Sequence, residues 1–460
     1  MNNSRQIKHL YARAGFGIRF EDLHQHENWS VKKAAKKLFE ASVQIQNIKV
    51  VTENLDLRYH PNQSEDEKKA IQEERNKQEK ALNNTWMQQM STSDAQLREK
   101  MTLFWHNHFA CNIGNSYYEQ QLNNIERANA LGNFKTMLIQ VSQAPGMLQF
   151  LNNQQNVKNH PNENFARELM ELFTMGRGNY TEQDIKESAR AFTGWQYDGK
   201  TASFVFRPGV HDTGVKTFLG NQANFCGEDI IDIIIKNPVT AKYICTKLYR
   251  YLVNDIPDDG HISQMADLFY KNNYEITPLL EFVFTADWFY DDKNIGNLIK
   301  SPVEFLVGLN RQFYVNYQNP DVLMQFQRTL GQVLFRPPNV AGWPGGRSWI
   351  DSSSLMYRMK IPSTILSAGI IDFNGKPTPE DQAYLAATKR QQFNVIKRTL
   401  TVPDWDRFFQ KIPLKTPHPE IAQFMLEPTM SARVLDEVNS APDIKTMLIQ
   451  VVSTPEYQLC

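Results

Sequence analysis

Apolar residues recur at helical spacing along most of this 460-residue chain. The stretch 160–176 shows the pattern most clearly, because its large apolar residues fall at i, i+4, i+7 and i+8. These residues are Phe165, Leu169, Leu172 and Phe173. Pro161 fits the first turn of the predicted helix, and Gly176 or Gly178 ends it. Comparable patterns predict helices over 5–24 (interrupted by Gly15 and Gly17), 30–46, 93–109, 118–151 (ending near Pro145 and Gly146 and resuming), 181–194, 228–254, 262–271, 276–288 and 302–316.

Several of these helices carry local start signals. Ser64 with Glu67 and Ser301 with Glu304 match the capping box, in which a serine and a glutamate three residues later bond each other's backbone N–H groups. Residues 64–84 are rich in charge and poor in large apolar side chains, so they form either a solvated helix or a mobile insertion.

A short sequence is repeated. Residues 135–141, Lys-Thr-Met-Leu-Ile-Gln-Val, recur at 445–451, and 277–290 resembles them more loosely. We expect the first two copies to be helices buried on their Met, Leu, Ile and Val side. The irregular spacing indicates a reused helix-plus-turn unit and not a solenoid.

Strand patterns are confined to one region. Phe204 and Phe206 alternate, a Pro-Gly turn follows and Phe218 closes the run, which predicts a small β-hairpin near 200–220. We therefore predict a mainly α, large irregular multi-helix protein, with a further strand only in the Pro-, Gly- and Trp-rich loop 335–350. We divide the chain into an N-terminal helical part (1–58), a charged helical insertion (59–92), a motif-bearing core (93–360) and a C-terminal helical part (361–460) that packs as one unit with the core.

Composition excludes several classes of protein. Lysine plus arginine and aspartate plus glutamate both number 50, and this balance argues against a nucleic-acid binder. No apolar run is long enough for a membrane span, and the first residues lack the apolar core of a signal peptide, so the default location is the cytoplasm. The four cysteines are scattered without metal-site spacing and are expected to be free thiols.

The densest group of ionisable residues lies on the 160–176 helix. His160, Glu163, Arg167, Glu168 and Glu171 fall within about three turns. Glu168 falls at the edge of the apolar face, where partial burial raises a carboxyl pKa and suits it to general acid–base catalysis or metal binding. The plainer alternative for Glu168 is a buried structural carboxylate. Arg167 either pairs with Glu163 or Glu171 on the same helix or binds a ligand.

Three histidines elsewhere are further candidates. His106 and His108 lie in an aromatic cluster, and with His160 they are the candidate ligands of a divalent metal, although a histidine among aromatics is often only a hydrogen-bonded core residue. His211 precedes Asp212 on the predicted turn, where the pair would form an oriented imidazole.

The loop 337–350 contains Trp343 and Trp349, which would stack on a ligand or pack onto helices. Motifs of the common esterases, nucleotide-binding enzymes, dehydrogenases and zinc proteases are missing from the sequence.

Six motif segments together resemble a bacterial family catalogued as domain of unknown function 1800. They are 9–17 (HLYARAGFG), 104–109 (FWHNHF), 160–176, 191–195 (AFTGW), 300–305 (KSPVEF) and 337–350. The resemblance covers nearly the whole chain in order and implies no known mechanism. It does imply a link to a twin-arginine-exported protein similar to alkaline phosphatases and sulfatases.

Two functional hypotheses follow. In the first, the protein is a hydrolase-like enzyme in which Glu168, His160, Glu163 and His211 act by general acid–base chemistry or around a divalent metal. In the second, it is a non-catalytic helical scaffold or binding partner of the exported phosphatase/sulfatase-like protein. That partner would carry it to the periplasm, with the Trp343–Trp349 loop as the contact surface.

Overall fold

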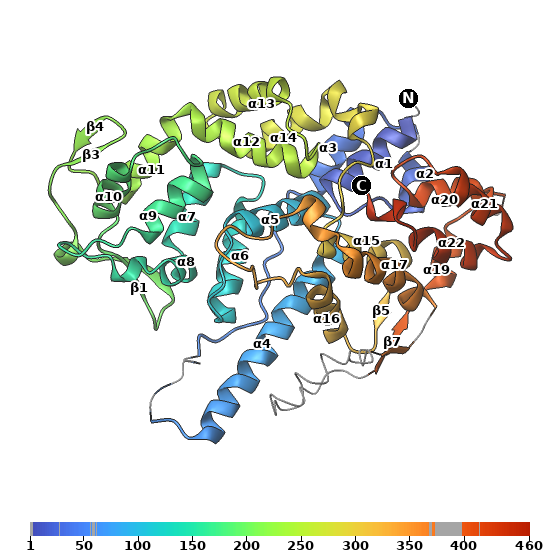
Figure 1. The fold of residues 1–460 in the computed structure, drawn as a ribbon, viewed down its shortest axis with the longest axis horizontal. Coiled ribbons are helices and arrows are strands. Elements are labelled where there is room, and N and C mark those ends of the chain that lie inside the picture. The colour runs from blue at the N-terminus through green and yellow to red at the C-terminus, as the bar shows by residue number, and fades with distance from the viewer. Residues whose placement is uncertain are drawn as a thin grey trace.

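The computed structural model describes residues 3–26, 28–55, 57, 60, 62–367, 370–372, 398–413 and 415–460 (Figure 1). The protein is mainly α, as its periodicity predicts, with small antiparallel strands. No helix in the described part of the chain is long and apolar enough to cross a membrane.

A first apolar core is built by two N-terminal helices and the helices from α5 to α14. Its helices are α1 (Asn3–Ala14), α3 (Val31–Ala41), α5 (Gln96–His108), α6 (Ser116–Asn129), α7 (Phe134–Gln143), α8 (Pro145–Phe150), α9 (Asn164–Glu168), α10 (Glu182–Ala191), α11 (Gly227–Lys236), α12 (Pro238–Leu252), α13 (Asp259–Lys271) and α14 (Ile276–Thr285). The predicted helix over 228–254 is thus two helices, because Pro238 starts a new one.

A second core is built by the C-terminal helices and the end of α4. Its helices are α4 (Glu65–Thr92), α15 (Pro302–Phe313), α16 (Asp321–Leu330), α17 (Ser352–Leu366), α19 (Trp405–Gln410), α20 (His418–Met425), α21 (Ala432–Ser440) and α22 (Ile444–Val452). Helix α2 (Phe20–His26) adds Phe20 to this core. The second core thus combines segments from before residue 104 with the chain after residue 300, and the proposed unit boundaries at 92 and 360 stay a prediction.

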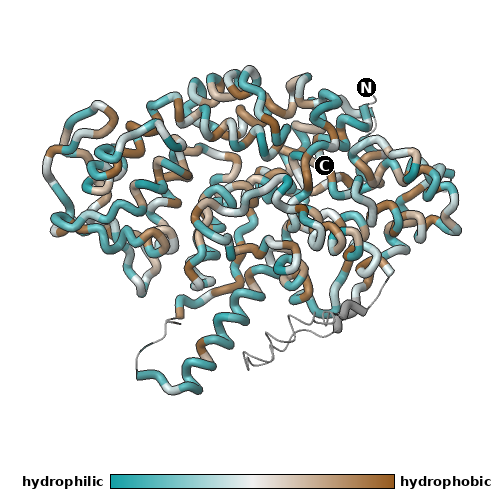
Figure 2. Tube along the Cα trace, in the orientation of Figure 1, coloured by the Kyte–Doolittle hydropathy of each residue, from teal (hydrophilic) through white to brown (hydrophobic). Residues whose placement is uncertain are grey.

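Helix α4 resolves the alternatives for the charged segment in favour of a helix. The predicted capping box is present, since the Ser64 hydroxyl accepts from the Glu67 N–H (3.2 Å) and the Glu67 carboxylate accepts from the Ser64 N–H (2.7 Å). Its first half is hydrophilic and extends away from the body of the molecule (Figures 1 and 2). Only the end of α4 is anchored, by buried Leu82, Trp86 and Met90.

Other local predictions are also confirmed. The capping box of Ser301 and Glu304 starts α15, and both copies of the repeat are helices, α7 and α22. Met, Leu and Val of each copy are buried, whereas the isoleucines are half-buried. The predicted helix start at Ser93 is wrong, because Ser93 ends α4 and α5 begins at Gln96.

The strands form two hairpins near the predicted position and one small sheet. Strand β1 (Trp195–Asp198) pairs with β2 (Ser203–Phe206), and β3 (Lys216–Phe218) with β4 (Asn221–Ala223). In the β1–β2 hairpin, Phe204 is paired with Tyr197 and Phe206 with Trp195, so neither phenylalanine is paired with Phe218. Strands β5 (Asn316–Tyr317), β7 (Arg398–Val402) and β6 (Ile370–Asp372) form the sheet. The 335–350 loop has no strand and only one short helical turn, η6 (Gly346–Trp349).

Candidate functional site

The helix predicted over 160–176 begins later than expected. His160 and Pro161 are exposed and precede α9, for which Glu163 is the N-cap residue. The helix widens into one π-helical turn, η2 (Leu169–Thr174), and ends at Gly176, as predicted, with φ +75°. A π-helical turn often marks a functional region, because it displaces the side chains around it from their usual positions.

Glu168 is half-buried on this helix, as predicted. Burial raises the pKa of its carboxyl group, and the negative charge of Glu171 raises it further. Within the described residues, no side chain forms a hydrogen bond or ion pair with it. Glu168 therefore stays a candidate acid–base group, but one without a positioning partner.

The charges around Glu168 form surface ion pairs. Arg167 pairs with Glu163 (3.2 Å) and with both carboxylate oxygens of Glu182 (2.9 and 2.8 Å), while Glu171 pairs with Arg177. All the side chains paired with Arg167 are at least one-third exposed. The arrangement matches the plain alternative for Arg167, a solvated ion pair on a helix.

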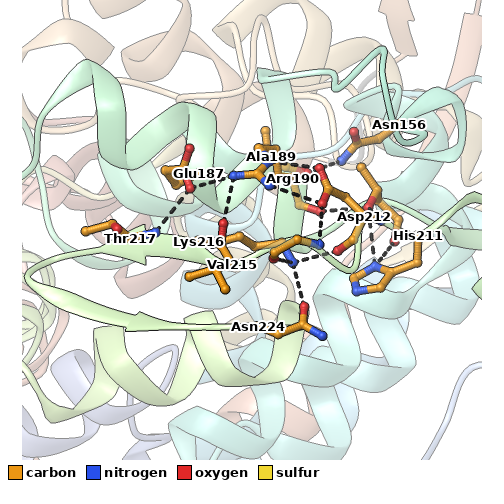
Figure 3. A network of polar contacts seen from close by, with 12 residues as sticks. Asn156, Glu187, Ala189, Arg190, His211, Asp212, Val215, Lys216, Thr217 and Asn224 are labelled. Atoms are coloured by element: carbon orange, nitrogen blue, oxygen red, sulfur yellow. Dashed lines mark hydrogen bonds and ion pairs between the residues drawn. The ribbon is translucent and has the colours of Figure 1, made fainter.

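His211 is oriented, but not by Asp212. Its Nδ1 donates to the backbone oxygen of Thr193 (2.8 Å), whereas the Asp212 carboxylate forms two bonds with Arg190 (2.8 and 3.1 Å; Figure 3). Buried Lys216 donates to the Asp212 carbonyl and to Asn224 in the same network. The His211–Asp212 pairing expected from the sequence is therefore wrong, because an arginine from α10 takes the carboxylate.

Both imidazole nitrogens of His106 are in use. Its Nε2 accepts from the Phe335 backbone N–H (3.1 Å), so the proton is on Nδ1, which lies 3.5 Å from the buried Glu126 carboxylate. The lone pair that would bind a metal is already taken by a backbone donor. His106 fastens the loop after α16 to the end of α5.

His108 is held in a single tautomer. The Phe173 carbonyl, 3.0 Å from Nε2, can only accept, so Nε2 carries the proton and Nδ1 accepts from Lys247 Nζ at 3.0 Å. Burial and the charge of Lys247 hold the pKa of His108 well below its usual range. The proposed trio of His106, His108 and His160 is not gathered at one point, and the described part of the chain contains no group of three or more His, Cys, Asp or Glu residues placed to hold a metal.

Asn107, between the two histidines, is a residue that the sequence pattern did not single out. Its amide oxygen accepts from the Trp343 N–H (2.7 Å), and its amide nitrogen donates to the Trp343 carbonyl (3.3 Å). Gly342 has φ +78°, and a Cβ there would overlap the Asn107 amide oxygen. In the sequence, Gly342 is the residue that could have indicated this contact, because a glycine permits both the positive φ and the close approach of the loop backbone to Asn107.

Trp343 and Trp349 are buried, with 5% and 8% exposure, so they do not form an exposed aromatic surface. They line a cavity of about 330 Å³ between the two cores, within the size range of small-molecule sites. His160, Glu163, Glu168 and His211 are not among its lining residues. Of the residues in the enzyme hypothesis, only His108 lines this cavity.

The cavity lining is rich in positive charge. It contains Arg13, Lys100, Lys247 and Arg250, but only two acidic side chains, Asp255 and Glu304. Lys100 and Glu304 neutralise each other in a buried salt bridge. None of the described carboxylates forms a salt bridge with the other three cations.

Arg13 and Lys247 are the unusual members of this group. Arg13 is 1% exposed, and its Nη2 donates to the Asn294 carbonyl and the Asn297 amide, but Nε and Nη1 have no partner among the described residues. Lys247 donates to His108 and to the Leu172 carbonyl (3.3 Å), and its Nζ lies 5.3 Å from the Tyr243 ring centroid. Burial lowers the pKa of Lys247 to about 8.

Comparison with known proteins identifies the family. A family model described as "Protein of unknown function (DUF1800)" matches residues 9–459. The chain belongs to this family. No curated protein and no solved structure matches it.

Four of the six motif segments of this DUF1800 protein meet at the cavity. They are 9–17, 104–109, 300–305 and 337–350, and they contribute Arg13; Phe104, Asn107 and His108; Ser301 and Glu304; and Trp343, Gly345 and Trp349. The 160–176 segment approaches from outside, through the bonds of Leu172 and Phe173 to Lys247 and His108.

Proposed function

We propose that this protein is an enzyme that binds a small anionic molecule in the cavity between the two cores, with Lys247 as its reactive group. The observation that carries the proposal is the meeting of four motif segments at this cavity. A cavity of this size with a few convergent charged groups is the usual make-up of a small-molecule site.

The charge balance supports an anionic ligand. Arg13, Lys247 and Arg250 line the cavity without a paired carboxylate, and for the buried Arg13 the lack of a counter-ion is costly. A ligand carboxylate or phosphate in the cavity would provide the missing negative charge.

The reactive group in this proposal differs from the one expected at first. Glu168 and His160 belong to a partly solvated helix surface, whereas Lys247 combines a cavity position, a lowered pKa and an ordered hydrogen-bond geometry. A lysine with a pKa near the working pH is available as a neutral amine, which an exposed lysine is not. A catalytic role of Glu168 stays a prediction, which the Glu168→Gln variant tests.

The scaffold alternative has less support. Trp343 and Trp349, its expected contact residues for an exported phosphatase/sulfatase-like partner, have buried side chains that line the cavity. A surface anchor of that kind requires exposed aromatic groups.

Binding of malonate and of inorganic phosphate to the full chain would test the proposal. Titration calorimetry at fixed ionic strength should give saturable 1:1 binding, weakened on the order of 5-fold or more by Arg250→Gln, which removes one charged partner. Arg433→Gln, at an exposed position on α21 outside the cavity lining, is the matched control and should bind like the original protein. Absence of saturable binding for both anions, or equal loss in the two variants, would reject the cavity as an anion site.

A further inference from the structure

The surroundings of the Lys247 side chain favour its neutral amine over the charged ammonium ion. No described carboxylate pairs with it, and its two hydrogen-bond acceptors, His108 Nδ1 and the Leu172 carbonyl, are both neutral. The Tyr243 ring covers it on another side. Such surroundings stabilise an ammonium ion far less than water does.

The two acceptors match the valence of a neutral amine. An uncharged lysine has two N–H groups and one lone pair, and the two contacts of 3.0 and 3.3 Å use both N–H groups. The lone pair is then left for a ligand, and Lys247 lines the cavity where that ligand would sit.

His108 is a poor base for a proton relay. Its Nε2–H is fixed on the Phe173 carbonyl, and its pKa lies well below the usual histidine range. It therefore holds the lysine amine in place without taking its proton, so His108 is a positioning residue. This geometry favours nucleophilic attack by Lys247 over proton transfer through His108.

We infer that Lys247 is a nucleophile that forms an imine with a small carbonyl compound carrying a carboxylate, the class of 2-oxo acids. The inference rests on the proposed function, because it takes the same cavity as the ligand site. The carboxylate would meet Arg13 and Arg250, and the carbonyl carbon would meet the Lys247 amine.

The step is balanced with the atoms named. The Nζ lone pair forms a bond to the carbonyl carbon, the carbonyl π electrons move to oxygen, and a proton moves from nitrogen to that oxygen. The resulting carbinolamine loses its hydroxyl group with a second proton as water, and a C=N bond forms. No oxidant, reductant or further reactant is required.

Reductive trapping with pyruvate tests the inference on the full chain. The protein is incubated with pyruvate and cyanoborohydride at pH 8, and peptide mass spectrometry locates the reduced adducts. We expect Lys247 to be labelled on the order of 10-fold or more faster than any other lysine, since burial and the cavity favour its neutral amine. The labelling rate should rise with pH and level off above the Lys247 pKa of about 8.

Lys300 is a matched control within the same chain. Burial lowers the pKa of Lys300 to about 8 as well, but its amine donates to the Tyr457 carbonyl (2.7 Å), and Lys300 lines a smaller neighbouring pocket of about 60 Å³ and not the cavity. If low basicity alone controlled labelling, both lysines would react. Labelling of Lys300 at the same rate as Lys247, or no labelling of Lys247, would overturn the inference.

Malonate separates this inference from the proposed function. Malonate carries carboxylates but no ketone, so it should bind in the cavity and slow the labelling of Lys247. Malonate binding that depends on Arg250, without any pyruvate adduct at Lys247, would overturn the imine and leave the anion site intact. Neither binding nor labelling would overturn both. The mapping is done on the unmodified protein, so it does not depend on whether a Lys247 variant folds.

Discussion

The helix that contains Glu168 and the cavity that contains Lys247 both hold a high density of charged groups. The two regions differ in how these charges are paired and solvated. On the helix, Arg167 and Arg177 each find exposed or partly exposed carboxylates, and water solvates the pairs. In the cavity, Arg13 is buried and Lys247 is half-buried, and neither has a carboxylate partner among the described residues. The number of ionisable groups is therefore a weaker sign of a site than an unbalanced charge that the fold keeps buried.

Breaking the buried Lys100–Glu304 pair of the cavity should cost far more stability than breaking an ion pair on the helix surface, and this is the largest difference that we expect between the two regions. Glu304→Gln leaves the Lys100 ammonium, whose side chain is 3% exposed, without its counter-ion and removes part of the α15 capping box. We expect the free energy of unfolding to fall by about 3–5 kcal/mol in urea denaturation. Glu163→Gln breaks a surface ion pair and should lower the unfolding free energy by under about 1 kcal/mol. Equal losses in Glu304→Gln and Glu163→Gln would show that burial of the ion pair makes no difference to stability.

The loop that closes the cavity can be tested by comparing its Gly342 with Gly331, which also has a positive φ. Gly342→Ala places a Cβ well inside contact distance of the Asn107 backbone oxygen, in a helix that cannot shift easily, and should cost about 2–4 kcal/mol of unfolding free energy. Gly331, which ends α16, has φ +85° and ψ 14°, and no atom lies within 4 Å of the position that an alanine Cβ would take, so Gly331→Ala should cost only about 1 kcal/mol. A loss for Gly331→Ala as large as that for Gly342→Ala would contradict the tight contact between Asn107 and the loop.

Lys247→Met should stabilise the folded protein while abolishing imine formation. A lysine with a pKa of about 8 when folded and 10.5 when unfolded binds fewer protons in the folded state. Its destabilisation is therefore complete below pH 8 and fades as the pH rises from 8 to 10.5. At pH 7 the variant should gain about 1–3 kcal/mol in unfolding free energy, and the gain should shrink at about pH 10.5. Exposed Lys271→Met is the control and should change little at either pH.

The surface ion pairs should give the smallest effect. Arg167→Gln removes contacts to Glu163 and Glu182 that are shared with water, so the unfolding free energy should change by less than about 1 kcal/mol. Malonate binding should not change in Arg167→Gln or in Glu168→Gln, because neither residue lines the cavity. Loss of malonate binding in Glu168→Gln would return that carboxylate to the active site and weaken the contrast between the helix and the cavity.

The sequence by itself determined the features that depend on neighbours within a few residues. Ser64 and Ser301 start their helices because each hydroxyl reaches the N–H three residues ahead, and residues 135–141 and 445–451 fold as helices because their apolar positions repeat at helical spacing. The family and the mainly helical class follow from the same kind of ordered local pattern.

Only the tertiary structure decided which charges stay unbalanced. Lys247 is an ordinary lysine in the sequence of an amphipathic helix, and nothing near it in the chain shows that His108, 139 residues away, will accept its hydrogen bond. Asp212 looked like a partner for His211 until Arg190 was brought to it from α10. Desolvation and pairing depend on atoms that the chain brings together from distant segments, so the fold sets them and the local sequence does not.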